Sequence, residues 1–110
     1  MKRGEVYWAH LAPRSGSEQQ GTRPVIVVSH DGFNETPGWR SVIVVPCSTS
    51  QVQRLRGPTV VPLPRGSGGL PREGEALGHQ ITTLDRAKLT KRLGQLDAST
   101  LFTVPRIPGF

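Results

Sequence analysis

Two short runs of β-branched residues constrain the fold of this chain more than any other feature of its sequence. Residues 23–29 read RPVIVVS and residues 41–46 read SVIVVP. Runs of this kind are apolar on both faces, so they are typical of strands that a sheet buries on both sides. Pro24 is expected at the start of the first strand, where a missing N–H disturbs the ladder least. The second strand is followed by three hydroxyl-bearing residues at positions 48–50.

The remaining pattern predicts further short strands joined by turns. The 13 Gly and 10 Pro residues are spread along the chain, and no segment has the periodicity of a long amphipathic helix. We therefore expect one mainly β domain over residues 1–110, a compact barrel or twisted sheet of roughly five to seven short strands. The other strands are expected at residues 4–11, 59–63, 75–81 and 91–96, with short helices or turns at 85–89, begun by Thr83 or Asp85, and at 98–103, capped by Asp97.

Net charge narrows the class of partner. The chain carries 14 Lys and Arg against 8 Asp and Glu, which gives a formal net charge of +6. Nine of the basic residues but only four of the acidic ones lie in residues 54–110. A basic surface attracts polyanions through counterion release and long-range steering. This charge favours a nucleic acid or an acidic protein as the partner.

Membrane insertion and secretion are not expected. No apolar stretch approaches the roughly 20 residues of a membrane span. The N-terminal residues, MKRGEVYW, lack the apolar segment of a secretory signal. The cytoplasm is therefore the expected location.

The sequence contains no recognisable motif for binding a metal or a cofactor. His10, His30, His79 and Cys47 do not have the spacing of a metal site, and none is expected. The GSGG sequence at residues 66–69 lacks the Lys-Ser/Thr that completes a phosphate-binding P-loop. No G-x-S-x-G motif for a serine hydrolase is present.

Three segments together resemble the MazF/PemK ribonuclease toxins. Residues 3–29, RGEVYWAHLAPRSGSEQQGTRPVIVVS, are similar to that family's first strand, its G-S-E-Q loop and its G-x-R-P strand start. Residues 42–51, VIVVPCSTSQ, are similar to its V-P-[CL]-[ST]-[ST] strand end. Residues 76–96, ALGHQITTLDRAKLTKRLGQL, are similar to its D-Q-[IV]-R-T-[IV]-D stretch and its K-R-x-G-x-L strand.

The chain departs from the family pattern in three places. His79 replaces the usual acidic residue, and Thr82 replaces the Arg of the same motif. The family's longer C-terminal helix is cut short, and VPRIPGF stands in its place. The first two changes affect any role carried over to those positions, and the third affects the antitoxin interface or stability.

The resemblance implies a fold and an activity. The fold would be a small SH3-like β-barrel of the CcdB/PemK type with short connecting helices, assembled as a homodimer. The activity would be sequence-specific, metal-independent cleavage of single-stranded RNA, mostly messenger RNA, leaving a 2′,3′-cyclic phosphate and a 5′-hydroxyl. The chain would be the toxin of a type II toxin–antitoxin system, neutralised by an acidic, MazE-like antitoxin.

Four residues are expected to act in catalysis. Arg23 heads a buried strand, and its guanidinium matches a phosphate bidentately and stays charged. Ser48 occupies the position of the family's catalytic Thr, and Thr49 would replace it if the strand register differs by one. Glu18, in the G-S-E-Q loop, is the candidate for a general base or for orienting Arg23.

RNA binding is expected along three loops, residues 13–22, 51–57 and 65–72. Trp39 or Phe33 is a candidate for stacking on a base, and a place in the core fits each equally well. The basic and polar side chains expected to contact RNA are Arg54, Arg56, Arg65, Arg72, His79 and Gln80.

Two other functions use the same kind of fold. One is a toxin that poisons gyrase, like CcdB, which would not need Arg23 or Ser48. The other is a non-enzymatic RNA-binding SH3-like module, in which the basic loops matter and the hydroxyls do not. The R-P strand start and the C-S-T strand end favour the nuclease, because fold likeness alone does not decide function.

Overall fold

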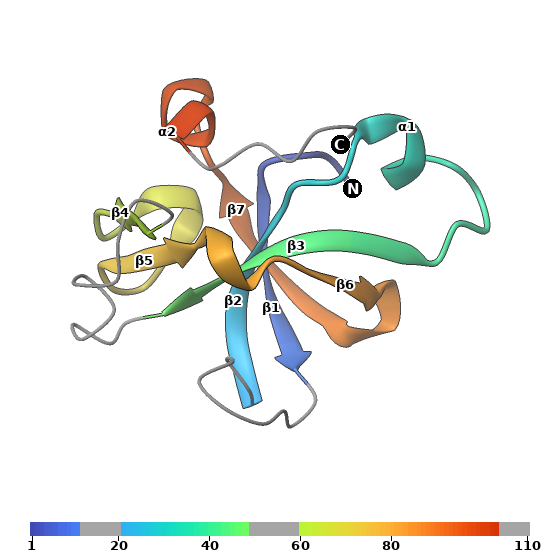
Figure 1. Cartoon of the computed structure of the whole chain (residues 1–110), viewed down its shortest axis with the longest axis horizontal. Coiled ribbons are helices and arrows are strands. Elements are labelled where there is room, and N and C mark those ends of the chain that lie inside the picture. Colours follow the sequence, from blue (N-terminus) through green and yellow to red (C-terminus); the bar gives the residue numbers. More distant parts are fainter. Residues whose placement is uncertain (12–20, 49–59, 104–110) are drawn as a thin grey trace.

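A computed structural model describes residues 1–11, 21–48 and 60–103, and it confirms a mainly β architecture (Figure 1). The strands in that part of the chain are β1 Glu5–Leu11, β2 Gly21–Val27, β3 Ser41–Ser48, β4 Val60–Leu63, β5 Gly74–Leu77, β6 Thr82–Asp85 and β7 Leu89–Gln95. The helical elements are α1 Asp31–Asn34 and α2 Ala98–Thr103, and the single 3₁₀ turns η2 Ser67–Gly69, η3 Gly78–Gln80 and η4 Arg86–Lys88.

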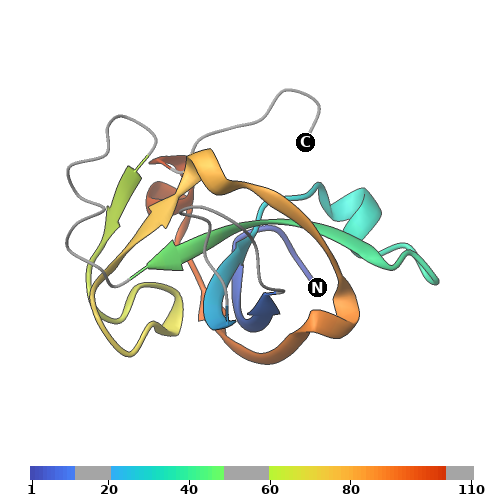
Figure 2. The same ribbon diagram turned by 60° about the horizontal axis from the view of Figure 1, so that its bottom comes forward.

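The strands form one antiparallel sheet that is strongly bent. Its order is β4-β5-β3-β2-β1-β7, and β6 also pairs with β3. β1 and β2 cross β3 steeply in Figure 1, and Figure 2 shows the β4–β5 hairpin beside one end of β3 and β6 beside the rest of it. Within the described strands, β4 and β7 do not pair with each other. The expected barrel is therefore not closed by hydrogen bonds.

A glycine contact bridges the gap in the barrel. η2, which follows β4, packs against β7. A Cβ added to Gly69 would lie 2.1 Å from the Leu93 carbonyl oxygen, and one added to Gly94 would lie 2.8 Å from the Gly68 carbonyl group. Backbone can approach backbone this closely only where no side chain intervenes. Packing of η2 on β7 thus takes the place of a ladder there.

Proline ends the ladder between β2 and β3. The two strands pair over three residues each, up to Val25 opposite Pro46. The Val28 N–H donates to the Ile43 carbonyl oxygen (2.9 Å), so the even-numbered residues of β2 direct their backbone groups toward β3. Pro24 therefore lacks the N–H that the next rung would require.

Pro24 does not lie at the start of its strand, where the sequence pattern predicted it. β2 begins at Gly21, so Pro24 is its fourth residue and lies opposite Trp8 of β1. The β1 ladder tolerates the proline because its missing N–H would point away from β1, toward the side where β3 has ceased to pair.

Pro46 interrupts the opposite edge of β3. Backbone groups alternate between the two edges of a strand, so Pro46 directs its missing N–H away from β2. Along that edge, β5 pairs with residues 47–48 and β6 pairs with residues 41–44. The intervening residues Gly78–Gln80 leave the ladder as η3.

Two expected elements are therefore corrected. The strand expected over residues 75–81 ends at Leu77 and is followed by η3, and a separate strand, β6, begins at Thr82. Thr83 lies inside β6, so the N-cap of the following 3₁₀ turn is Asp85, whose carboxylate accepts from the Ala87 N–H at 2.8 Å. Local propensity offered Asp85 as one of two caps but missed the break after Leu77, because that break depends on which β3 residue lies opposite.

Both faces of β2 and β3 are buried, as the β-branched runs predicted. Each fully buried Val or Ile side chain stabilises the fold by about 1.5–3 kcal/mol relative to an exposed one. One cluster contains Val6, Ile26, Val28, Val45, Cys47, Val61, Leu63, Leu70, Ala76 and Leu96. The cluster on the other face contains Ala9, Leu11, Val25, Val27, Val42, Val44 and Leu84.

Specific polar contacts fix the short helices. Asp97 caps α2 as expected, accepting from the Thr100 N–H at 2.7 Å. The Arg86 guanidinium donates to the carbonyl oxygens of Phe33 (3.1 Å) and Asn34, which holds the end of α1 against η4. No helix of the described residues is long and apolar enough to cross a membrane.

Replacing Gly69 with alanine should destabilise the fold far more than the same change at Gly66. Both glycines have positive φ (+81° and +91°), so either alanine is strained by about 1–2 kcal/mol. The Cβ at Gly69 would also collide with the Leu93 carbonyl, which adds about 1–3 kcal/mol, whereas nothing lies within 4 Å of a Cβ at Gly66. Chemical denaturation of both variants measures the difference, and equal losses would contradict a close contact of η2 with β7.

Asp31 should make stability depend on pH. The Arg3 backbone N–H donates to its carboxylate at 2.6 Å, and this hydrogen bond lowers the pKa of Asp31, with burial opposing it. A carboxyl whose pKa is lower in the folded state stabilises the fold above its unfolded pKa of about 3.9, and that stabilisation is lost as the pH falls through the folded value.

Asp31→Asn keeps an oxygen that accepts the Arg3 N–H and removes the titration. The melting temperature of this variant should therefore fall less than that of the wild type as the pH is lowered from 7 to below the ordinary carboxyl range. Parallel melting curves for the two proteins across that range would show that Asp31 is not involved.

Candidate active site

A pocket of about 310 Å³ opens where β2 and β3 stop pairing. Its size is at the lower end of the range for ligand sites. Residues from β1, β2, β3, β5 and the connection after η2 line it: Trp8, Thr22, Arg23, Pro24, Cys47, Ser48, Leu70, Pro71, Arg72 and Gly74.

The lining combines positive charge, a hydroxyl and apolar surface. Arg23 and Arg72 contribute two guanidinium groups, and Ser48 contributes the end of β3. No carboxylate belongs to the part of the lining that the structure describes. Paired guanidiniums suit a phosphate or phosphodiester, and the apolar residues Trp8 and Leu70 suit the flat face of a base or sugar.

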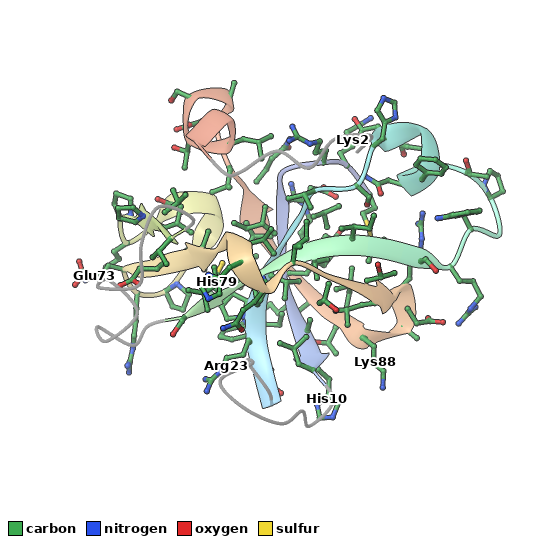
Figure 3. The ribbon with its side chains drawn as sticks, viewed as in Figure 1. Lys2, His10, Arg23, Glu73, His79 and Lys88 are labelled. Atoms are coloured by element: carbon green, nitrogen blue, oxygen red, sulfur yellow. The ribbon has the colours of Figure 1, made fainter. Side chains whose placement is uncertain are left out.

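The sheet register brings Arg23 and Ser48 together. Val25 lies opposite Pro46 in the last rung of the β2–β3 ladder. Arg23 is two residues before Val25, and Ser48 is two residues after Pro46. A two-residue step keeps a side chain on the same face of a strand, so Arg23 and Ser48 lie level with each other on one face. Figure 3 shows Arg23 beside the start of β2, near the end of β3.

The two residues differ in exposure. Arg23 is exposed, while Ser48 is only 6% exposed and pairs with Glu75 of β5. Arg72 is exposed and lies between η2 and β5, so the glycine contact of η2 with β7 helps to set its position. Of the residues predicted from sequence, the pocket thus unites Arg23, Ser48 and Arg72.

The other predicted RNA-binding residues fall into two groups. Arg65 is exposed just before η2 and does not line the pocket. His79 and Gln80 lie in η3, with the His79 Nε2 and Gln80 Nε2 atoms 3.4 Å apart. Figure 3 shows His79 on the segment that passes beside β3. The predictions for Glu18, Thr49, Arg54 and Arg56 lie outside the described residues.

Phe33 and Trp39 lie at the opposite end of β3 from the pocket. Their rings are 5.3 Å apart and each residue is 46% exposed. Trp39 precedes β3, whereas Ser48 ends it, and the strand between them spans about 23 Å at its usual rise. The structure therefore does not bring these aromatic side chains to the pocket.

Sequence reasoning missed Trp8 and Leu70, which line the pocket, and Glu75, which lies opposite Ser48 beside it. Trp8 reaches the pocket from β1, where the sequence pattern predicted a strand but gave no sign of a pocket. Leu70 reaches the pocket through the loop that packs on β7. Glu75 is a charged residue in an otherwise apolar strand and is only 2% exposed. The charge of Glu75 in this apolar strand was the local sequence signal that could have pointed to it. Glu75 is the residue opposite Ser48.

No group of three or more His, Cys, Asp or Glu residues that could hold a metal ion occurs in the described ranges 1–11, 21–48 and 60–103.

A family comparison covers almost the whole chain. Residues 2–106 match the model of the PemK-like, MazF-like toxins of type II toxin–antitoxin systems. The chain belongs to this family. The resemblance inferred from three sequence segments is thereby confirmed.

Individual members of the toxin family agree with this. Endoribonuclease EndoA of Bacillus subtilis is 38% identical over 97 residues, 88% of this chain and 81% of that protein. A crystal structure of MazF from Deinococcus radiodurans superposes with a TM-score of 0.73 at 27% identity, covering 94% of this chain and 87% of that one. A MazE–MazF crystal structure from the same organism gives a TM-score of 0.68 at 26% identity, covering 94% and 86%.

Cys47 in this MazF-like toxin should be chemically inert. It borders the pocket but is 2% exposed, and burial raises the pKa of its thiol to about 12. The thiolate is the reactive form of cysteine. Iodoacetamide at mildly alkaline pH should therefore leave the folded protein unmodified and label it in concentrated guanidinium chloride, as read by mass spectrometry. Rapid labelling of the folded protein would mean that β3 opens at the pocket.

Proposed function

We propose that this toxin-family member is an endoribonuclease that cuts single-stranded RNA at specific sequences, with the 2′-hydroxyl of the RNA as nucleophile. The observation that carries the proposal is the meeting of Arg23 and Ser48, from two strands, at one pocket with no carboxylate in its described lining. A cationic pocket with a hydroxyl at its edge suits a phosphodiester.

The proposed cleavage is a transesterification within the RNA. The 2′-hydroxyl gives up its proton to a general base and its oxygen attacks phosphorus, while the bond to the 5′-oxygen breaks and that oxygen takes up a proton. The products carry a 2′,3′-cyclic phosphate and a 5′-hydroxyl. Arg23, aided by Arg72, stabilises the negative charge that develops on the phosphoryl oxygens. The RNA supplies its own nucleophile and the arginines supply the positive charge, so the proposed chemistry requires no metal ion.

The proton transfers involve hydroxyls and a carboxylate. Ser48 hydrogen-bonds the 2′-hydroxyl or the scissile phosphate, and Thr49 is its proposed neighbour in that task. Glu18 remains the proposed general base or partner of Arg23. Because a guanidinium has a pKa above about 12, charge stabilisation is a better role for Arg23 than proton donation.

Sequence choice is proposed to arise along the basic surface around the pocket. Single-stranded bases are read by hydrogen bonds to their edges and by stacking. Arg65 and the η3 residues His79 and Gln80 are the proposed RNA contacts within the described part of the chain. Arg54 and Arg56 are proposed to follow the phosphate backbone with them.

The proposed partners are an acidic antitoxin and a second copy of the chain. The MazE–MazF crystal structure from Deinococcus radiodurans supports an antitoxin complex, and the net charge of +6 supports an acidic binding segment. Such a segment would fold over the RNA site, and the complex would weaken with salt. A homodimer and a cytoplasmic location, where messenger RNA is found, belong to the same proposal.

Arg23→Ala should reduce cleavage of a labelled single-stranded RNA in EDTA by about 10²–10³-fold or more, because a charge-stabilising donor is lost. Arg23→Lys keeps the charge but not the two-pronged geometry, so it should restore only part of the rate. Gel analysis of fragment length and of cyclic-phosphate ends measures both effects, and circular dichroism and size-exclusion chromatography confirm folding and assembly.

Lys88→Ala is the matched control. Lys88 is an exposed cation on η4, and Figure 3 shows it on the other side of β1 and β2 from Arg23. Its loss changes net charge equally and should leave the rate within about twofold of the wild type. Wild-type activity in Arg23→Ala would refute the role of Arg23. RNA that is bound but never cut by the wild type would favour the RNA-binding module instead.

A further inference from the structure

Glu75 places a carboxylate where the fold otherwise buries apolar side chains. It lies in β5 beside Ala76 and Leu77, which are fully buried, and is itself 2% exposed. Removing a carboxylate from water is unfavourable unless hydrogen bonds or cations hold it. Burying the Glu75 carboxylate therefore costs folding free energy that an apolar residue at the same position would not.

The sheet sets Glu75 directly opposite Ser48. The two are Cα partners in the β3–β5 ladder. Opposed residues in an antiparallel pair present their side chains on the same face, with Cβ atoms about 4.5–5.5 Å apart. Ser48 lines the pocket and Glu75 does not. Glu75 is thus the neighbour of Ser48 across the β3–β5 ladder, on the same face and outside the lining of the pocket.

Three chemically different side chains form one cross-strand row. The register of β2 and β3 carries Arg23 level with Ser48, and that of β3 and β5 adds Glu75. The row reads cation, hydroxyl, carboxylate across β2, β3 and β5. Its exposed end is Arg23 and its buried end is Glu75.

We propose that Glu75 is a positioning residue that orients the Ser48 hydroxyl, an inference that rests on the endoribonuclease function proposed above. A serine hydroxyl has one donor and two acceptor lone pairs. When the O–H of Ser48 donates to the Glu75 carboxylate, the lone pairs of Oγ face the pocket. The lone pairs then accept a hydrogen bond from the 2′-hydroxyl of the RNA, which holds the 2′-oxygen in line for attack on phosphorus.

A neutral amide in place of the Glu75 carboxylate would no longer fix the direction of the Ser48 O–H. A glutamine side chain can donate to Oγ as well as accept from it, so the serine proton would no longer be held away from the RNA. The expected defect is in the alignment of the 2′-hydroxyl, and so in the rate of the chemical step rather than in RNA binding.

Glu75→Gln tests this in the full-length protein. Its single-turnover cleavage rate should fall by about tenfold or more, while its affinity for the RNA stays within about threefold of the wild type. Glu73→Gln is the matched control, because Glu73 is exposed and Figure 3 shows it directed outward, away from Arg23. That variant should cleave within about twofold of the wild-type rate. Thermal unfolding establishes that each variant is folded.

A double-mutant cycle separates positioning from a structural role. If Glu75 acts through Ser48, adding Glu75→Gln to Ser48→Ala should change the rate by less than about twofold. A looser β3–β5 contact would instead slow both backgrounds equally, which would overturn the proposal. Glu75→Asp retains the carboxylate, so it should cleave faster than Glu75→Gln, and it provides the comparison if the glutamine variant does not fold.

The outcomes also separate this inference from the function beneath it. A wild-type protein that leaves RNA intact overturns the nuclease itself and the Glu75 role with it. A wild-type protein that cleaves, with Ser48→Ala impaired and folded Glu75→Gln at full rate, overturns the Glu75 role alone.

Discussion

The absence of two backbone donors determines where this molecule has a site. Pro24 and Pro46 cannot supply the N–H groups that would continue the hydrogen bonding of β3 on its two edges. β3 therefore stops pairing with β2 at Val25–Pro46 and pairs with β5 over its last two residues, Cys47 and Ser48. The position of the pocket is a consequence of backbone hydrogen bonding, and the side chains determine only its lining.

The electrostatics of the pocket follow from the same divergence. Arg23 comes from β2 and Arg72 from the connection that the η2–β7 glycine contact holds in place. Two like charges at one pocket favour an anion as its ligand. On the function proposed above, a phosphodiester and an acidic antitoxin segment would be alternative ligands for the same positive charge.

The sequence predicted what local pattern can encode. The buried strands β2 and β3 follow from β-branched runs, and Asp85 and Asp97 act as caps because their carboxylates reach nearby N–H groups. The split of residues 75–81 into β5 and η3 was missed, since it depends on Pro46, some 30 positions earlier in the chain, lying opposite. Arg23 and Ser48 were predicted through resemblance to a family. Their roles remain predictions, as do those of Glu18, Thr49, Arg54 and Arg56.

Taken alone, the sequence determined the class of fold, the two doubly buried strands, the excess of positive charge and the family. These depend on residue type and short-range spacing, which survive in any conformation of the chain. Tertiary structure decided that the barrel is left open and bridged by glycines, that Trp8, Leu70 and Arg72 join one pocket, and that Glu75 lies opposite Ser48 in the ladder. Those facts depend on strand register, and register is fixed only when distant segments pair and bury their shared faces.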